Sequence, residues 1–110
     1  MSVNNRVLFE AKDAEAVQTT QFVSANARAI IDKFTAVNTT AGALTLSVNL
    51  VVQAGTAGPT NLIVKAKSIA ANETYTFPEL VGHYLMPGGF ISTLASATGL
   101  TIRASGRELT

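Results

Sequence analysis

The stretch ALTLSVNLVV, residues 43–52, decides the fold because its aliphatic residues fall on every second position. Leucine or valine occupies positions 44, 46, 48, 50 and 52, and threonine, serine and asparagine occupy positions 45, 47 and 49. Successive side chains of a strand point to opposite faces, so this alternation predicts a half-buried β-strand. The second face is polar but uncharged, although exposed protein surfaces usually carry many lysine and glutamate side chains.

Similar patterns predict further short strands separated by turns. We expect strands at residues 27–38, 43–53, 62–70, 74–80, 90–96 and 100–106. The first of these, 27–38, also has spacings that suit a helix, but its β-branched residues and the following NTTAG turn favour a strand. The turns at 38–42 and 97–99 predict hairpins that join the strands on either side.

The segment LIVKAKSIA, residues 62–70, contains the only close pair of basic residues. Strand alternation directs Leu62, Val64 and Ala66 inward and places Lys65 and Lys67 together on an outward, solvated face.

The N-terminal residues 1–25 are ambiguous, because alanine, lysine and glutamate favour helix whereas valine, threonine and phenylalanine favour strand. We expect an extended arm or two short edge strands with a turn near Asp13, and a β-sandwich domain over residues 26–110. The count of seven or eight short strands, with no long helix, predicts a single-domain antiparallel β-sandwich of jelly-roll or immunoglobulin-like type.

The charge content is unusually low for a chain of 110 residues. Charged residues make up 14% of the sequence, against about 25% in an average globular protein. A small monomer normally stays soluble through a charged surface, so we expect part of the surface to lie against other subunits, including copies of the same chain. The net charge of +1 gives no reason to expect a specific nucleic acid or an anionic membrane as partner.

The residues that could support catalysis or bind a cofactor are few. The chain has one histidine, His83, and no cysteine, so a zinc site made of several such ligands is not expected. No nucleophile elbow, phosphate-binding loop or calcium loop occurs. A carboxylate pair for glycoside hydrolysis could in principle be built from Glu73 and Glu79, but a small sandwich with 6% aromatic residues rarely forms a sugar-binding cleft. We therefore expect no catalytic, metal or cofactor-binding residues and no enzyme activity.

Three stretches combine strand and turn signals in a distinctive order: VNTTAGALTLSVNLVV, NLIVKAKSIAANETYTFPELVGHYLMPGGFISTLAS and LTIRASGREL. Through them, the segment of about residues 30–109 resembles a group of small tailed-bacteriophage virion proteins. The resemblance implies a β-sandwich that packs on neighbouring proteins, as a capsid decoration (cement) protein or as a neck or tail component. It implies assembly in a virion, after synthesis in the bacterial host cytoplasm, and it supplies no catalytic residue. No signal peptide and no apolar run long enough to span a membrane is visible.

Two apolar clusters outside the clearest alternating strands are candidates for protein contacts. They consist of Val7, Leu8, Phe9, Tyr84, Leu85 and Met86. The uncharged polar strand face is a further candidate, because it can be buried between subunits without desolvating charged groups. The alternative explanation is that threonine simply suits strands.

Three classes of function remain open at this point. The leading hypothesis is a capsid decoration protein that forms homo-oligomers and binds the major capsid protein, with a neck, tail or fibre-attachment component as the alternative. A receptor- or carbohydrate-binding module would need exposed aromatic residues around a groove, and the lack of tryptophan argues against it. A small enzyme would have to use His83 as its base.

Overall fold

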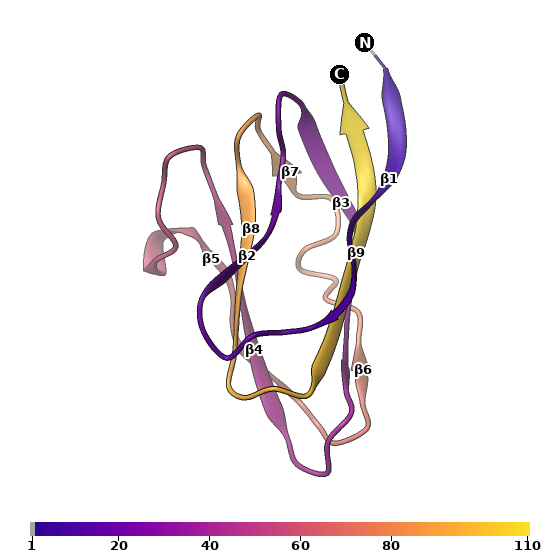
Figure 1. Ribbon diagram of the computed structural model, residues 1–110, viewed down its shortest axis with the longest axis vertical. Helices are drawn as coiled ribbons and strands as arrows, with labels where there is room; N and C mark the ends of the chain where they lie inside the picture. Colours follow the sequence, from indigo (N-terminus) through magenta and orange to yellow (C-terminus); the bar gives the residue numbers. More distant parts are fainter. Residues whose placement is uncertain (1) are drawn as a thin grey trace.

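The computed structural model describes residues 2–110 as two antiparallel sheets packed face to face (Figure 1). The strands are β1 (Val3–Asp13), β2 (Thr19–Val23), β3 (Arg28–Asn38), β4 (Leu44–Val51), β5 (Leu62–Ile69), β6 (Thr74–Tyr75), β7 (Tyr84–Leu85), β8 (Phe90–Ala95) and β9 (Leu100–Leu109), with a short 3-10 helix η1 (Pro59–Asn61) before β5. Sheet A has the order β1-β9-β3-β6, with β7 also paired to β3, and sheet B has the order β2-β8-β4-β5. The prediction of an antiparallel β-sandwich is confirmed.

The strand order is that of a jelly roll. An immunoglobulin-like sandwich keeps its first two strands in one sheet, whereas here β1 and β2 lie in different sheets, as do β3 and β4 and also β8 and β9. The predicted hairpins at 38–42 and 97–99 are therefore wrong, because each of these turns carries the chain from one sheet to the other. A turn signal marks a reversal of direction and does not reveal which strand becomes the partner.

The alternating stretch forms β4 in the middle of sheet B, as predicted. Leu46 and Val48 are fully buried between the sheets, and Leu50 is half-buried on the same side. Val52 lies beyond the end of the strand and is 70% exposed. The segment 28–38 is also a strand, β3, so the helical alternative for this region is excluded.

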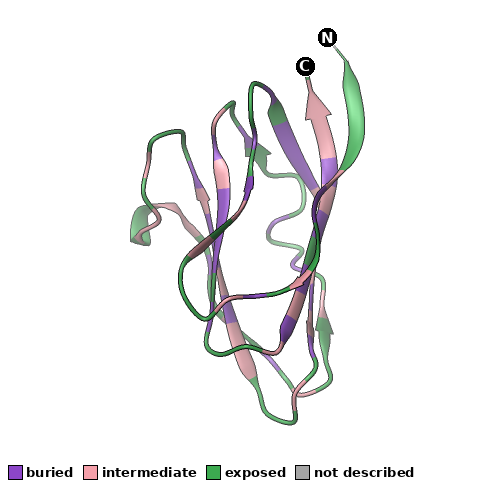
Figure 2. Cartoon of the chain, viewed as in Figure 1, coloured by how far each residue is buried: buried purple, intermediate pink, exposed green. Residues whose placement is uncertain are grey.

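The core fills the space between the two sheets, and Figure 2 shows buried segments on strands of both. Three edge-to-face ring contacts join aromatic side chains that lie in this core or pack against it. Their centroid distances are 5.6 Å for Phe9–Phe34, 5.2 Å for Phe34–Phe77 and 4.7 Å for Tyr75–Phe77. Each such pair adds about 0.5–1.5 kcal/mol beyond simple burial, so these rings hold β1, β3 and the segment after β6 together.

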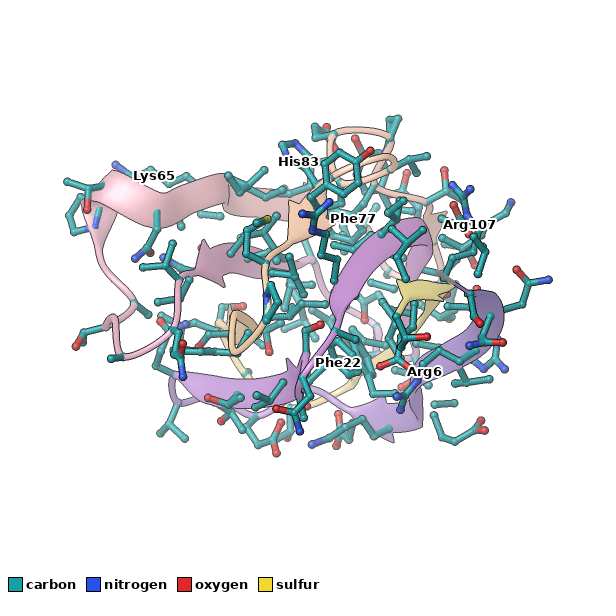
Figure 3. The ribbon with its side chains drawn as sticks, turned by 90° about the horizontal axis from the view of Figure 1, so that it is seen from above. Arg6, Phe22, Lys65, Phe77, His83 and Arg107 are labelled. Atoms are coloured by element: carbon teal, nitrogen blue, oxygen red, sulfur yellow. The ribbon has the colours of Figure 1, made fainter. Side chains whose placement is uncertain are left out.

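A β-bulge in β5 overturns the predicted directions of Ala66 and Lys67, whereas Val64 is buried and Lys65 is exposed as predicted. Ala66 has a positive φ of 47° and is exposed, and its N–H donates to the Ser47 hydroxyl at 2.8 Å. The extra residue reverses the alternation, so Lys67 shares the inner side with Leu46 while Lys65 points outward (Figure 3). The Lys67 ammonium lies 4.5 Å from the centre of the Tyr75 ring at the open edge of the sandwich.

The N-terminal segment belongs to the sandwich. β1 is the edge strand of sheet A, paired with β9, and β2 is the edge strand of sheet B, paired with β8. The turn expected near Asp13 follows β1 directly. The expected division between residues 1–25 and 26–110 therefore does not correspond to a boundary in the structure, and within the described residues the edge-strand alternative applies.

Candidate functional site

The charged residues are distributed very unequally over the two sheets. Of eight basic and seven acidic residues, four lie on β1, three on β3 and three on β9, all in sheet A. The strands of sheet B carry only Lys65 and Lys67, both on β5. The other three strands of sheet B, β2, β4 and β8, thus have no charged residue at all.

We define the uncharged face as the outward side of β2, β4 and β8 in sheet B. The register of the strands assigns its side chains, because residues directly opposite each other share a face. Its members are Thr20, Val23, Thr45, Ser47, Asn49, Val51, Phe90, Ser92 and Leu94. Val23 and Leu94 are the exposed large apolar side chains of this face, at 50% and 38% exposure.

One part of the uncharged face is covered by the chain itself. Asn49 is 3% exposed, although it points away from the core. Its amide nitrogen donates to the Gly58 carbonyl at 3.0 Å and to Asn61 Oδ1 at 2.7 Å, and its Oδ1 accepts from the Gln18 amide at 3.3 Å. The same Gln18 nitrogen donates to the Ser92 hydroxyl at 2.8 Å. Asn49 therefore fastens the loop around η1 and the segment before β2 to the outside of sheet B.

The remaining part of the uncharged face is open. Leu94 lies opposite Ser47, and Thr20 lies opposite Ser92, so small polar side chains surround the exposed leucine. Thr45 and Ser47 are half-buried and carry no charge that a partner would have to desolvate. Such a surface combines low desolvation cost with hydrogen-bonding groups, which suits contact with another protein.

Sheet A, by contrast, presents ion pairs to solvent. Arg107 contacts both carboxylate oxygens of Asp32, with its closest contact at 2.9 Å, and this pairing raises the pKa of Arg107. Arg6 contacts Glu108 at 2.9 Å, and its guanidinium lies 5.1 Å from the centre of the Phe22 ring (Figure 3). Exposed pairs of this kind contribute about 0–1 kcal/mol each, so they mark a hydrated surface.

Three of the six residues in the apolar clusters that were expected to make contacts are buried. Leu8, Phe9 and Leu85 are 4%, 8% and 3% exposed and belong to the core. A register shift between Val7 and Phe9 places a bulge at Leu8, and the bulge allows two consecutive side chains to be buried. The expectation that these three residues contact a partner is thus corrected, and Val7 is half-buried on the outer side of sheet A.

Tyr84 and Met86 are exposed, at 63% and 55%. Together with Val52 they border a hollow of about 90 Å³ near the ends of β4 and β7. The structure does not bring them to β1, because β1 and β7 lie on opposite sides of β9 and β3 in sheet A. The two predicted clusters therefore do not form one surface.

The only histidine, His83, is exposed in the turn before β7, where its carbonyl accepts the Ile31 N–H at 3.0 Å. Within residues 2–110, no group of three or more His, Cys, Asp or Glu side chains gathers in a way that would hold a metal ion. The same part of the chain has no helix that is long and apolar enough to cross a membrane.

The predicted contact residues do not include Val23 or Leu94. The predicted strand at 90–96 contains no charged residue, which is a signal for Leu94, whereas Val23 lies outside the predicted strands. Comparison with protein-family models, with curated proteins and with solved structures finds no match to this chain.

Proposed function

We propose that this chain is a structural virion protein of a tailed bacteriophage, a capsid decoration protein that binds the particle through the uncharged face of sheet B. The observation that carries the proposal is the absence of charged residues from β2, β4 and β8, while β1, β3 and β9 carry ten. A sandwich that needed only to be soluble would have no reason to keep three adjacent strands of one sheet free of charge.

The charged and the uncharged surface differ in the free energy that their burial costs. Burial of an unpaired lysine or glutamate against a partner costs several kcal/mol, whereas threonine and serine need only a hydrogen-bond partner. Val23 and Leu94 would add apolar contact area worth about 25 cal/mol per Å². Weak contacts of this kind suffice for a protein that binds many identical sites, because neighbouring copies reinforce one another.

The sequence resemblance and the jelly-roll strand order support the same proposal. The resemblance covers about residues 30–109, which span β3 to β9. Jelly rolls are common in viral capsid proteins, although the same fold serves other functions. A neck or tail component would use the same type of contact, and the copy number per particle separates the two: hundreds of copies indicate decoration, and a handful indicates a neck or tail position.

The proposal is tested with particles of the encoding phage that have been assembled without this protein. Purified wild-type chain is expected to co-sediment with them, and Leu94→Lys is expected to weaken this binding at least tenfold, because the partner would have to bury an unpaired charge. The matched control is Thr101→Lys, which adds the same charge on the outward side of the central strand of sheet A, opposite Asp13.

Two results would contradict the proposal. Wild-type chain that does not associate with any part of the particle removes the virion function altogether. Binding that survives Leu94→Lys but is lost with Thr101→Lys shows that sheet A, with its charged residues, makes the contact.

A further inference from the structure

The first half of β1 is the least protected sheet edge in the described chain. Edge strands usually carry bulges, charges or prolines that prevent pairing with another molecule. β5 has its bulge and Lys65, β2 has five residues with a register shift, and β6 and β7 have two residues each. In contrast, Val3–Val7 pairs with residues 105–109 without interruption and contains one charged residue, Arg6.

The hydrogen-bond pattern shows which groups on this edge are free. Ser2 and Thr110 exchange two backbone hydrogen bonds, both at 2.9 Å. Bonded and non-bonded pairs alternate in an antiparallel ladder, so Asn4 and Arg6 also bond to β9. Val3, Asn5 and Val7 consequently direct their N–H and C=O groups away from β9. Of these groups, the Val7 carbonyl accepts a bond from its neighbour Arg6, at 3.2 Å.

We propose that two copies of the chain pair through this edge, β1 against β1, in antiparallel orientation around a twofold axis at Asn5. In this register Val3 lies opposite Val7 of the second copy, and Asn5 lies opposite Asn5. The three outward-directed residues of each copy then form three bonded pairs, each exchanging two hydrogen bonds. The Arg6 contact to the Val7 carbonyl is exchanged for one of these bonds.

The register follows from the free groups and the side chains together. A shift by one residue places outward-directed groups against groups already bonded to β9, and a shift by two either loses a bonded pair or reaches the bulge at Leu8. In the proposed register Arg6 lies beside Asn4 of the second copy rather than beside another arginine. Valine meets valine on the opposite face, so the edge complements itself, as a twofold interface requires.

The symmetry of this pairing has a consequence for binding. A twofold axis that joins two antiparallel edge strands into one continuous sheet stands perpendicular to that sheet, so both copies keep sheet B on the same side. The two uncharged faces therefore point in one direction. This consequence rests on the proposed function: a dimer would place two binding faces on one particle surface and gain from avidity. The pairing itself does not depend on that function.

A charge exchange at Asn5 tests the pairing directly. Sedimentation velocity at about 0.1 mM, where a micromolar dimer is almost fully formed, is expected to show a dimer for the wild type. Asn5→Lys and Asn5→Asp each place like charges opposite one another and are expected to be monomeric. An equimolar mixture of the two variants is expected to recover the dimer, whereas the neutral control Asn5→Thr dimerises by itself.

A second measurement reports the register, because the native chain has no cysteine. Residues of a bonded antiparallel pair have Cα atoms about 5.5 Å apart, within the disulfide range of about 4.4–6.8 Å. Asn5→Cys is thus expected to form a disulfide dimer on oxidation. Asn4→Cys is not, because in this register the residues at position 4 of the two copies do not lie opposite each other.

A monomeric wild type, a dimeric Asn5→Lys variant or a mixture that does not associate would each overturn the proposal. Loss of dimerisation with intact particle binding would leave the proposed function standing.

Discussion

Replacement of Asn49 tests whether the buried polar centre of the uncharged face serves the chain itself. The Asn49→Ala variant removes three hydrogen bonds, to Gly58, Asn61 and Gln18, at 3.0, 2.7 and 3.3 Å. A typical hydrogen bond contributes about 1 kcal/mol net, which gives about 3 kcal/mol in total. Gly58 and Asn61 are only half-buried, so water replaces part of the loss. We expect a decrease of about 2 kcal/mol in the free energy of unfolding.

The assay is urea unfolding followed by circular dichroism, with a thermal melt beside it. For a domain of this size, about 2 kcal/mol corresponds to a fall in Tm of roughly 8–12 °C. Limited proteolysis is expected to cleave the loop at 54–61 faster in Asn49→Ala than in the wild type, because the loop loses its anchor. The matched control is Thr20→Ala, an exposed outward position in the same sheet, where the change should stay within about 0.5 kcal/mol.

If Asn49→Ala unfolds within about 0.5 kcal/mol of the wild type and its loop resists protease equally well, the three bonds do not hold the loop. The loop around η1 would then be held by contacts other than those of Asn49.

Three further changes test other parts of the structure. Gly106→Ala is expected to destabilise the chain by about 3 kcal/mol or more, measured by urea unfolding, because a Cβ at this position would overlap the Ile30 carbonyl. Ala66→Gly is expected to stabilise it by up to about 1 kcal/mol in the same assay, since glycine adopts the positive φ at this bulge without strain. Hydrogen bonds from Lys12 and a glutamine side chain lower the pKa of Glu15 in the folded chain. The lowered pKa stabilises the fold at a pH above the unfolded pKa, and this stabilisation is lost as the pH falls through the folded pKa. Glu15→Gln should therefore show a smaller loss of stability than the wild type between pH 5 and pH 3, by about 0.5 kcal/mol or less for an exposed pair.

Local periodicity predicted most of the longer strands, but the strand expected at residues 74–80 covers only Thr74–Tyr75. The alternation of aliphatic and polar residues in 43–52 identified β4, and β-branched content chose strand over helix for β3. Both signals depend only on residues that are close together in the sequence. The all-β class followed from the same signals repeated along the chain.

Local sequence patterns did not predict which strands pair or where the bulges lie. Nothing local to the turn at 38–42 shows that β3 and β4 belong to different sheets, because pairing depends on residues far apart in sequence. The bulge at Ala66 reversed Lys67, and the bulge at Leu8 buried a segment that looked like an exposed cluster. A single extra residue reverses every side chain beyond it, and no sequence pattern marked either position.

The uncharged face can be recognised only after the strand order is known. The sequence showed that the chain is poor in charge, but it did not show that the deficit belongs to one sheet. β2, β4 and β8 are separated by many residues in the chain and become neighbours only through the strand order of sheet B. The uncharged face is thus a property of the fold.

The most direct test of the account compares the two faces on the assembled particle. Because the native chain lacks cysteine, Leu94→Cys and Thr101→Cys each provide one thiol, on sheet B and sheet A respectively. Maleimide labelling of free and particle-bound protein then measures which face is covered. We expect binding to protect the thiol at position 94 and to leave the thiol at position 101 reactive. Equal labelling at position 94 in the free and bound states, with protection at position 101, would contradict this expectation.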